Sequence, residues 1–461
     1  MPNNENRNYQ LEMEREIAKI RASGRKPRLV LHACCAPCSS AVLERLTRDF
    51  EIIVYFDNPN ISPQAEFIHR AEELKRLIRE MPLEGGVCAE IAPYDSESFY
   101  EAVRGHENDP ETGGRCTICY ELRLRGTARY AASIGADYFT TTLSISPLKD
   151  ARRLNAIGAR ISAEFGVPYL YSDFKKKDGY RRSCALSAQY NLYRQDFCGC
   201  VFSREQRHPE IEDAELIRAR LLRPHTIELH DEIDSTNTRA RHLAQNGAAH
   251  GTAVIADLQT AGRGRFDRKF HSPAGTGVYM SVILRENLSA EGIGLLTPMA
   301  AVAVARAIRT VAGLEAQIKW VNDVYLNGKK VCGILCESAL REGKPEYVVI
   351  GIGVNAGAAE FPEELRGIAT SIQNESGRAV SRSRLIAEIL NEMDVLAEDP
   401  QSCMEEYRAR SSVLGKRVTV YRGADVFEAD AVAIDDAGNL IVRAADGLQT
   451  LCSGEISVRA V

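Results

Sequence analysis

Short apolar runs alternate with longer amphipathic segments along the first 170 residues of the chain. The predicted strands lie at 28–34, 51–60 and 137–145, and the predicted helices at 37–46, 63–81, 120–135 and 149–166. Strands alternating with helices in this way predict a parallel α/β sheet of Rossmann-like type. Ligands of such sheets bind at the carboxyl ends of the strands, so residues 32–38 (HACCAPC), directly before a helix, are a candidate site.

The pattern changes after a charged stretch at about 204–224, which contains no chemical motif. Strands then become frequent and helices fewer. The apolar runs that predict these strands lie at 252–258, 277–285, 330–338 and 347–355. From about Gly415 the chain consists of short alternating strands separated by turns at Asp435–Gly438 and Asp446–Gly447. This last segment predicts a small β barrel.

The length of 461 residues is too great for one ordinary core and predicts two or three domains. We expect a first domain at 1–205, a linker at 206–225, a second domain at 226–414 and a small β domain at 415–461. Hydrophobic content of 44% and charged content of 26% are typical of a soluble globular protein. The net charge of -5 excludes a general attraction for nucleic acid, so RNA contact would require a local basic patch.

Nothing in the sequence predicts export or insertion into a membrane. The N-terminal stretch MPNNENRNYQLEMEREIAKI is polar and lacks the apolar region of a signal peptide, and no apolar run is long enough to span a bilayer. We therefore expect a cytoplasmic protein with no membrane partner. In that compartment 13 cysteines predict metal ligands or redox thiols rather than a disulfide framework, and nine of them lie in the first 200 residues.

Two cysteine motifs are candidates for a metal centre. Cys116 and Cys119 form a C-x-x-C pair, whose two sulfurs can reach one metal, although a redox pair has the same spacing. Cys34 and Cys35 are adjacent, so they can serve one site only in a turn, or else two neighbouring metal centres. A buried core thiol is the ordinary alternative for any one of them, and we assign Cys38 to that class.

A third motif, Cys198-Gly199-Cys200, is a candidate redox pair. A disulfide across C-x-C closes a small strained ring, and strained disulfides are the labile ones. The alternative is a pair of further metal ligands. Nearby, residues 174–182 (FKKKDGYRR) form a local basic patch, which is either a solvated face or a surface that holds a phosphate backbone.

Six ordered motifs of the first half resemble the QueH-type epoxyqueuosine reductases over roughly residues 27–205. They are HACCAPC, YFDNPNI, RCTICYELRL, FTTTLSISPLK, DFKKKDGYRRS and LYRQDFCGCVFS. The resemblance implies reduction of epoxyqueuosine to queuosine at the wobble position of tRNA, with electrons from an unidentified donor. It also implies a [4Fe-4S] cluster on Cys34, Cys35, Cys116 and Cys119, and a redox-active pair at Cys198 and Cys200.

Three motifs of the second half are suited to nucleotide chemistry. The loop QTAGRGRFDRKF (259–270) combines glycines, which let backbone N–H groups approach phosphates, with arginines, which bind the same charge. DSTN (234–237) offers hydroxyls and an amide at a helix start, and KWVND (319–323) offers a lysine near a carboxylate. Taken singly, each motif is as well explained by a mobile loop, a helix cap or an exposed strand end. No Walker A motif occurs in the chain.

Together these motifs resemble the BirA-type biotin protein ligases over roughly residues 226–461. The resemblance implies a class II synthetase-like α+β catalytic domain and an SH3-like β domain. It implies that biotin and ATP, with Mg2+, form biotinyl-5′-AMP, and that the biotinyl group passes to a lysine of the biotin carboxyl carrier protein of acetyl-CoA carboxylase. The implied binding residues are Ser235, Thr236, Asn237, Gln259, Gly262, Arg263, Gly264 and Arg265, with Lys319 also catalytic.

The sequence therefore predicts a multidomain, bifunctional enzyme. BirA-type repressors carry an N-terminal winged helix domain, and the reductase-like segment occupies that place here, so we expect no operator DNA as a partner. The alternative keeps the ligase and makes the first half a metal- or cluster-bearing tRNA-binding module without turnover. An ATP-dependent tRNA sulfur-transfer enzyme of similar fold is disfavoured, because no phosphate-binding glycine signature follows the first strand.

Overall fold

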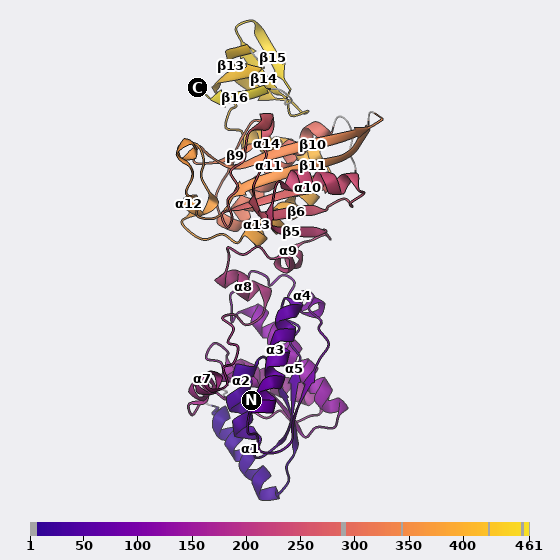
Figure 1. The fold of residues 1–461 in the computed structure, drawn as a ribbon, viewed down its shortest axis with the longest axis vertical. Coiled ribbons are helices and arrows are strands. Elements are labelled where there is room, and N and C mark those ends of the chain that lie inside the picture. The colour runs from indigo at the N-terminus through magenta and orange to yellow at the C-terminus, as the bar shows by residue number, and fades with distance from the viewer. Residues whose placement is uncertain (1–6, 287–291, 343, 423–424, 453–455, 461) are drawn as a thin grey trace. The chain divides into compact units, whose positions relative to one another are not determined.

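The computed structural model describes residues 7–286, 292–342, 344–422, 425–452 and 456–460. The chain divides into two compact units, Met1–Arg207 and His208–Val461, and each is described by itself (Figure 1).

The first unit is built on a four-stranded sheet in the order β3-β2-β1-β4, and every neighbouring pair of strands is parallel. The strands are β1 (Arg28–His32), β2 (Glu51–Phe56), β3 (Val87–Ile91) and β4 (Tyr138–Thr141). The predicted parallel sheet is thus confirmed, with β4 ending earlier than expected because Thr142–Ile145 form a 3-10 turn.

Helices cover both faces of this sheet. They are α1 (Tyr9–Ser23), α2 (Ala36–Leu46), α3 (Gln64–Glu80), α4 (Glu97–Ala102), α5 (Gly114–Ser133), α6 (Ala151–Phe165), α7 (Gly179–Gln189) and α8 (Val201–Arg207). Successive residues of a strand point to opposite faces, and β1 shows why both faces are apolar. Leu29 and Leu31 belong to the core that includes α2 and α3, whereas Val30 belongs to the core that includes α5 and α6.

The second unit contains a seven-stranded mixed sheet in the order β5-β6-β7-β11-β10-β9-β8 (Figure 1). The strands are β5 (Ile227–Ile233), β6 (Ala253–Gln259), β7 (Gly277–Leu284), β8 (Gln317–Lys319), β9 (Asp323–Leu326), β10 (Lys329–Arg341) and β11 (Lys344–Asn355). Only the β5–β6 pair is parallel among the pairs described. The helices are α9 (Ala214–Arg220), α10 (Thr236–Gln245), α11 (Ile293–Ala312), α12 (Ile372–Ser376), α13 (Arg382–Leu396) and α14 (Met404–Ala409).

Helix α11 is the centre of this unit's core. Within the described residues it is the one helix long and apolar enough to cross a membrane by composition, but 72% of its most apolar window is buried inside the protein. It packs on α13, α14 and strands β8 to β11, so the core accounts for its apolar composition.

The C-terminal segment forms a five-stranded antiparallel sheet in the order β15-β14-β13-β12-β16. Its strands are β12 (Arg417–Arg422), β13 (Asp425–Ile434), β14 (Leu440–Ala444), β15 (Gly447–Leu451) and β16 (Ile456–Ala460). It is joined to the larger sheet by hydrogen bonds from the Trp320 indole to the Gly438 carbonyl (3.0 Å) and from Arg408 Nε to the Ile434 carbonyl (2.8 Å).

The segment expected to be a linker contains helix α9, which is part of the second unit. Leu216 and Ile217 are buried, and α9 packs against α13. The Asp213 N–H donates to Ser383 Oγ (2.8 Å), and Arg382 Nε donates to the Glu210 carbonyl (2.8 Å). Because most residues around Leu216 and Ile217 are charged, the sequence pattern did not predict that these two side chains are buried.

A buried carboxyl group in this segment makes the stability of the second unit depend on pH. Glu212 lies 3.4 Å from Arg382 Nη1, but the same nitrogen is only 2.5 Å from Asp257 Oδ1. Burial, which outweighs Arg382, raises the pKa of Glu212 from about 4.5 to about 8. A carboxyl whose pKa is raised on folding binds its proton more tightly in the folded state, so its contribution is lost as pH rises from about 4.5 through about 8.

Glu212→Gln is therefore expected to stabilise the second unit by about 1–2 kcal/mol at pH 8.5 and by much less at pH 5. Urea unfolding followed by the fluorescence of Trp320, the one tryptophan of the chain, reports this unit alone. Glu210→Gln, at an exposed side chain, is the matched control. An identical pH dependence in wild type and Glu212→Gln would show that Glu212 titrates normally.

Candidate functional sites

Three cysteines gather where β1 ends and α2 begins. The sulfurs of Cys34, Cys35 and Cys38 all lie within 4.8 Å of one another, and those of Cys34 and Cys35 are 3.7 Å apart. Cys35 is the N-cap residue of α2, so the chain turns here and the adjacent side chains can face one site. Cys38, expected to be a core thiol, joins the group because Cys35 and Cys38 are three residues apart at a helix start.

Cys116 and Cys119 lie in the first two turns of α5, which begins six residues earlier than the sequence pattern indicates. They line a small cavity of about 340 Å³ together with Cys198 and Cys200. The structure thus brings together two cysteine motifs that are about 80 residues apart in the sequence.

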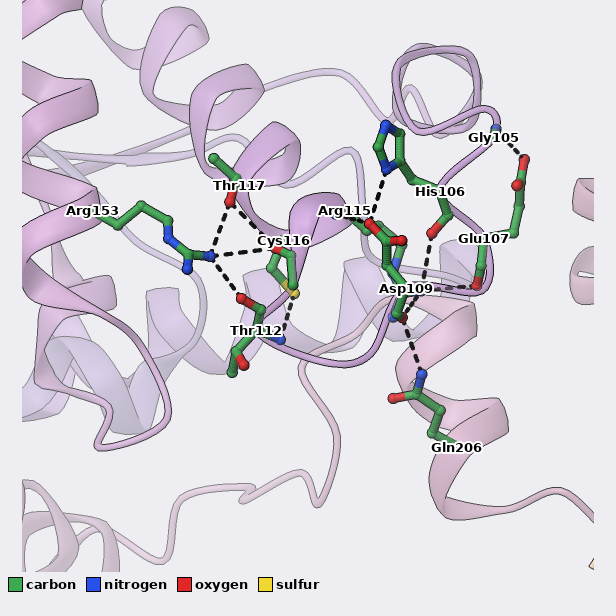
Figure 2. Close-up of polar contacts among 11 residues, drawn as sticks. Gly105, His106, Glu107, Asp109, Thr112, Arg115, Cys116, Thr117, Arg153 and Gln206 are labelled. Atoms are coloured by element: carbon green, nitrogen blue, oxygen red, sulfur yellow. Dashed lines mark hydrogen bonds and ion pairs between the residues drawn. The ribbon is translucent and has the colours of Figure 1, made fainter.

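The loop before α5 is tied down around Cys116 (Figure 2). The Thr112 N–H donates to Cys116 Sγ (3.2 Å), and Arg153 Nη1 donates to the Thr112 carbonyl (2.6 Å). Arg115 Nη1 donates to the Asp109 carbonyl (2.6 Å), while Gln206 Nε2 donates to the same oxygen (3.3 Å). These bonds fix the Cys116 sulfur before any ligand binds.

A second, larger cavity of about 1210 Å³, open to solvent, adjoins the Cys34 group. It is lined by Cys34, Cys35, Cys38 and Cys198, by the cations Arg123, Lys149, Arg194 and Arg207, and by further residues that include Tyr180, Asp196 and Glu111. Cys198, Arg123, Lys149 and Glu111 line both cavities. Because Cys198 borders both spaces, its thiol can face a ligand in the larger cavity and a metal centre in the smaller one.

Most of the predicted basic patch at 174–182 is already paired within the unit. Lys175 contacts Asp173 (2.8 Å), Lys177 contacts Glu14 (2.5 Å) and Arg182 contacts Glu44 (2.6 Å). Only Tyr180 of that run lines the larger cavity. The positive charge at the cavity comes instead from residues that the sequence pattern did not single out, including Arg194 and Arg207.

Hydrogen bonds from neighbouring thiols favour the thiolate form of two cysteines. Hydrogen bonds from Cys35 and Cys38 lower the pKa of Cys34, and a hydrogen bond from Cys200 lowers the pKa of Cys198, with help from Lys149. Burial, together with Arg123, lowers the pKa of His32 to about 3, so this histidine stays neutral at pH 7. Arg123 is fully buried and lies 3.9 Å from Cys119 Sγ.

In the second unit most of the predicted ligand residues line one cavity of about 490 Å³. Of the predicted set, it is lined by Ser235, Thr236, Asn237, Gln259, Arg263, Gly264 and Arg265. Gly262 is buried behind them: a Cβ there would lie 2.5 Å from Ser272 Oγ and 2.7 Å from the Phe270 carbonyl, so only glycine fits. Lys319 is not among the lining residues.

The floor of this cavity is a hydrogen-bonded set of polar side chains at the start of α10. The N–H and hydroxyl of Thr236 donate to Gln259 Oε1 (2.9 and 3.1 Å). Ser281 Oγ approaches both Thr236 Oγ1 (2.8 Å) and Asn237 Oδ1 (2.6 Å). These mutual bonds hold the amide and hydroxyl groups in place for a small polar ligand.

The glycine–arginine loop lies between β6 and β7 and closes one side of the cavity. Arg263 Nη1 lies 3.1 Å from Glu337 Oε1, and Arg265 Nη1 donates to Asn322 Oδ1 (3.3 Å). The Phe270 ring lies against Gly353, where an added Cβ would be only 2.6 Å from the ring. A side chain at that strand position would therefore push the loop away.

Lys330 is the lysine that lines this cavity, and the sequence reasoning missed it. Its Nζ lies 2.6 Å from Asp323 Oδ1, at the start of β9. The Nζ of Lys319, the lysine expected from the sequence, lies 5.7 Å from the centre of the Tyr325 ring. Lys319 ends β8, and Lys330 lies near the start of β10. Which of the two lysines reaches the cavity is decided by the fold of these strands, and the KWVND motif alone does not contain that information.

Comparison with known families divides the chain at the same place as the fold does. Residues 29–206 match the family "Epoxyqueuosine reductase QueH", residues 229–355 match the "Biotin/lipoate A/B protein ligase family", and residues 413–459 match the "Biotin protein ligase C terminal domain".

Individual relatives agree with these matches. The epoxyqueuosine reductase QueH of Staphylococcus epidermidis is 38% identical over 204 residues, which is 43% of this chain and 86% of that protein. The bifunctional ligase/repressor BirA of Bacillus spizizenii is 38% identical over 237 residues, which is 50% of this chain and 72% of that protein. A biotin protein ligase structure from Aquifex aeolicus is 27% identical, with a TM-score of 0.45, over 51% of this chain and 99% of that one. The chain is therefore a fusion of two enzymes that belongs to the QueH epoxyqueuosine reductase family through its first half and to the BirA-type biotin protein ligase family through its second.

Proposed function

We propose that the first half reduces epoxyqueuosine to queuosine in the wobble position of tRNA, and that the second half attaches biotin to a lysine of the biotin carboxyl carrier protein. The observation that carries the first proposal is the pair of adjoining cysteine-lined cavities, one of them lined with cations and wide enough for a nucleotide. Cations suit a polyanionic RNA. The proposed setting is the cytoplasm, with no membrane and no operator DNA as partners.

The cysteines fit an iron–sulfur centre. Thiolates are the protein ligands of such clusters, and Cys116 and Cys119 already line one buried cavity. We propose that Cys34, Cys35, Cys116 and Cys119 hold a [4Fe-4S] cluster, with Cys38 as a further donor next to them. When bound, the cluster supplies single electrons, which come from an electron donor that is not identified.

The residues of the chain supply the other parts of the reaction. Removing the epoxide oxygen as water requires two electrons and two protons. The thiols of Cys198 and Cys200 hold both, and become a disulfide when they give them up. Lys149, near Cys198, stabilises the thiolate form of that cysteine. Arg194 and Arg207 bind backbone phosphates of the tRNA at the cavity mouth.

For the ligase, we propose that biotin lies against the polar floor formed by Ser235, Thr236, Asn237 and Gln259. Arg263 and Arg265 then bind the biotin carboxylate and the ATP phosphates, with Gly262 and Gly264 giving the loop its close approach and Mg2+ accompanying the nucleotide. Lys330, together with Lys319 of the KWVND motif, stabilises the charge that develops at the reacting carboxyl. The ordered loop shields biotinyl-5′-AMP from water until the carrier lysine attacks.

The experiment that tests both halves uses cells that accumulate epoxyqueuosine and lack their own biotin ligase activity. The chain is expressed, tRNA is digested to nucleosides for mass spectrometry, and biotinylated carrier protein is detected on streptavidin blots. Wild type is expected to give queuosine and biotinylated carrier. Cys116→Ala/Cys119→Ala is expected to lose queuosine and keep biotinylation, whereas Arg263→Ala is expected to do the reverse.

Each variant serves as the control for the other, because both are the same full chain. If soluble wild type with bound iron leaves epoxyqueuosine unchanged while it still biotinylates the carrier, the reductase proposal fails. The first half would then be a metal- or cluster-bearing tRNA-binding module.

A further inference from the structure

One face of helix α3 carries polar side chains that hold the segment leading to the Cys198–Cys200 pair. Glu66, Arg70 and Glu73 are spaced by four and three residues, so they share this face. The Tyr193 N–H donates to Glu73 Oε1 (2.9 Å), and the Tyr193 hydroxyl donates to Glu66 (3.2 Å). The chain from residue 193 onward is thus fixed to α3 immediately before the two cysteines.

Arg70 makes the contact closest to the cysteines. Its side chain is 1% exposed, its Nε lies 2.6 Å from Glu66 Oε1, and its Nη1 donates to the Cys198 carbonyl (3.1 Å). Its guanidinium also lies 5.3 Å from the centre of the Phe197 ring. Among the described residues, Arg70 Nη2 is buried with no hydrogen-bond acceptor. The buried charge is therefore held by Glu66 and by the backbone of the cysteine loop.

Gly199, between the two cysteines, lies directly against Arg70. Its φ is +110°, which strains any residue with a side chain. A Cβ at this position would lie 3.1 Å from Arg70 Nη1 and 2.8 Å from Ile61 Cγ1. The Gly199 carbonyl accepts from the Ser62 N–H (3.0 Å). The loop between the thiols is thus enclosed on the side of α3 and of residues 61–62.

We propose that Arg70 is a positioning residue that holds the Cys198–Gly199–Cys200 loop in its dithiol conformation and so sets the equilibrium between dithiol and disulfide. This inference rests on the proposed function, in which the pair is redox-active. In the structure both cysteines are free thiols while the Arg70 contact is made. Closing the small C-x-C ring turns the peptide groups between the sulfurs, and this weakens the hydrogen bond to the Cys198 carbonyl.

The equilibrium is measured on the full chain with glutathione, which balances the reaction. Two thiols and one glutathione disulfide give one protein disulfide and two molecules of glutathione. Samples equilibrated at graded glutathione ratios are alkylated and digested with trypsin, which cleaves after Arg194 and Arg204. The peptide QDFCGCVFSR (195–204) contains only these two cysteines, so its mass reports the fraction oxidised.

Arg70→Gln is expected to shift the equilibrium about tenfold toward the disulfide, which corresponds to a reduction potential about 30 mV more negative. Arg70→Lys keeps the charge but cannot contact Glu66 and the Cys198 carbonyl through separate guanidinium nitrogens. It is expected to give an equilibrium constant between those of wild type and Arg70→Gln. Arg79→Gln is the matched control, since Arg79 lies on the same helix with an exposed side chain in its last turn. It is expected to stay within twofold of wild type.

An unchanged equilibrium in Arg70→Gln, or an equal shift in Arg79→Gln, overturns the proposal. If Arg70→Gln does not fold, Gly199→Ala acts on the same contact from the loop, and its failure to shift the equilibrium overturns it equally. The measurement needs no turnover, so its result is independent of whether Cys198 and Cys200 are required to make queuosine.

Discussion

Replacing Lys330 by glutamine is expected to slow formation of biotinyl-5′-AMP by roughly 10²- to 10³-fold, since the loss of one preorganised charge at a reacting carboxyl has an effect of this size. Lys330 lines the cavity beside Arg263 and Arg265, and Asp323 holds its Nζ at 2.6 Å. Lys319→Gln is expected to cost less than about tenfold, because that side chain is not among those that line the cavity.

The rate is measured in single turnovers with biotin and ATP, by the release of pyrophosphate. Biotin affinity is measured separately by calorimetry and is expected to change little in Lys330→Gln, since the charge that Lys330 stabilises develops in the transition state. If Lys319→Gln proves the more damaging change, the role of Lys330 proposed from the cavity geometry is wrong, and the original motif-based choice of Lys319 stands.

The second large effect concerns the cysteine pair of the first half. Cys198→Ala/Cys200→Ala is expected to lower queuosine formation by roughly 10³-fold or more, because the residues that act as one chemical unit are lost together. Iron and sulfide content are expected to stay at the wild-type level, since other cysteines are proposed to hold the cluster. This combination separates the redox pair from the cluster ligands.

The assay uses purified tRNA that contains epoxyqueuosine, with a strong chemical reductant in place of the donor and nucleoside mass spectrometry as the readout. Cys184→Ser is the control, since Cys184 on α7 is not among the residues lining either cavity. Queuosine formation within tenfold of wild type in the double variant would exclude the dithiol as an electron store. Loss of iron from that variant would instead make Cys198 and Cys200 metal ligands.

The sequence predicted three of the four strands and four of the eight helices of the first unit, and it missed β3, α1, α4, α7 and α8. The elements that were predicted are those with a clear hydrophobic pattern. The strand at Arg28–His32 has an apolar, buried centre at Leu29–Leu31, as expected of a strand covered on both faces, and α3 has a clear helical period. The role of the polar face of α3 could not be predicted from the same helical pattern. Glu66 and Arg70 look like an ordinary surface pair in the sequence, whereas the fold buries Arg70 against the carbonyl of Cys198.

Candidate site residues could be predicted where consecutive residues of one motif reach the cavity together. They could not be predicted where the tertiary structure decides which of several nearby residues reaches it. The residues Ser235, Thr236 and Asn237 lie at one helix start, so the motif carries them into the cavity together. Lys330 reaches the cavity only through the β9–β10 hairpin, which no local spacing encodes. Cys38 could have been found from the C-x-x-C spacing it shares with Cys35.

Helix α9 bears on how such a chain can be taken apart or recombined. Residues 207–228 lie outside both the reductase and the ligase family matches, yet Leu216 and Ile217 fill the ligase core and Glu210 accepts from Arg382. The boundary between the two units therefore falls before this segment, after Arg207, rather than in its middle. A recombinant ligase fragment that starts at His208 keeps helix α9 packed on α13. A fragment that starts at Thr226 lacks α9, exposes the apolar surface of α13 that α9 covers, and should aggregate.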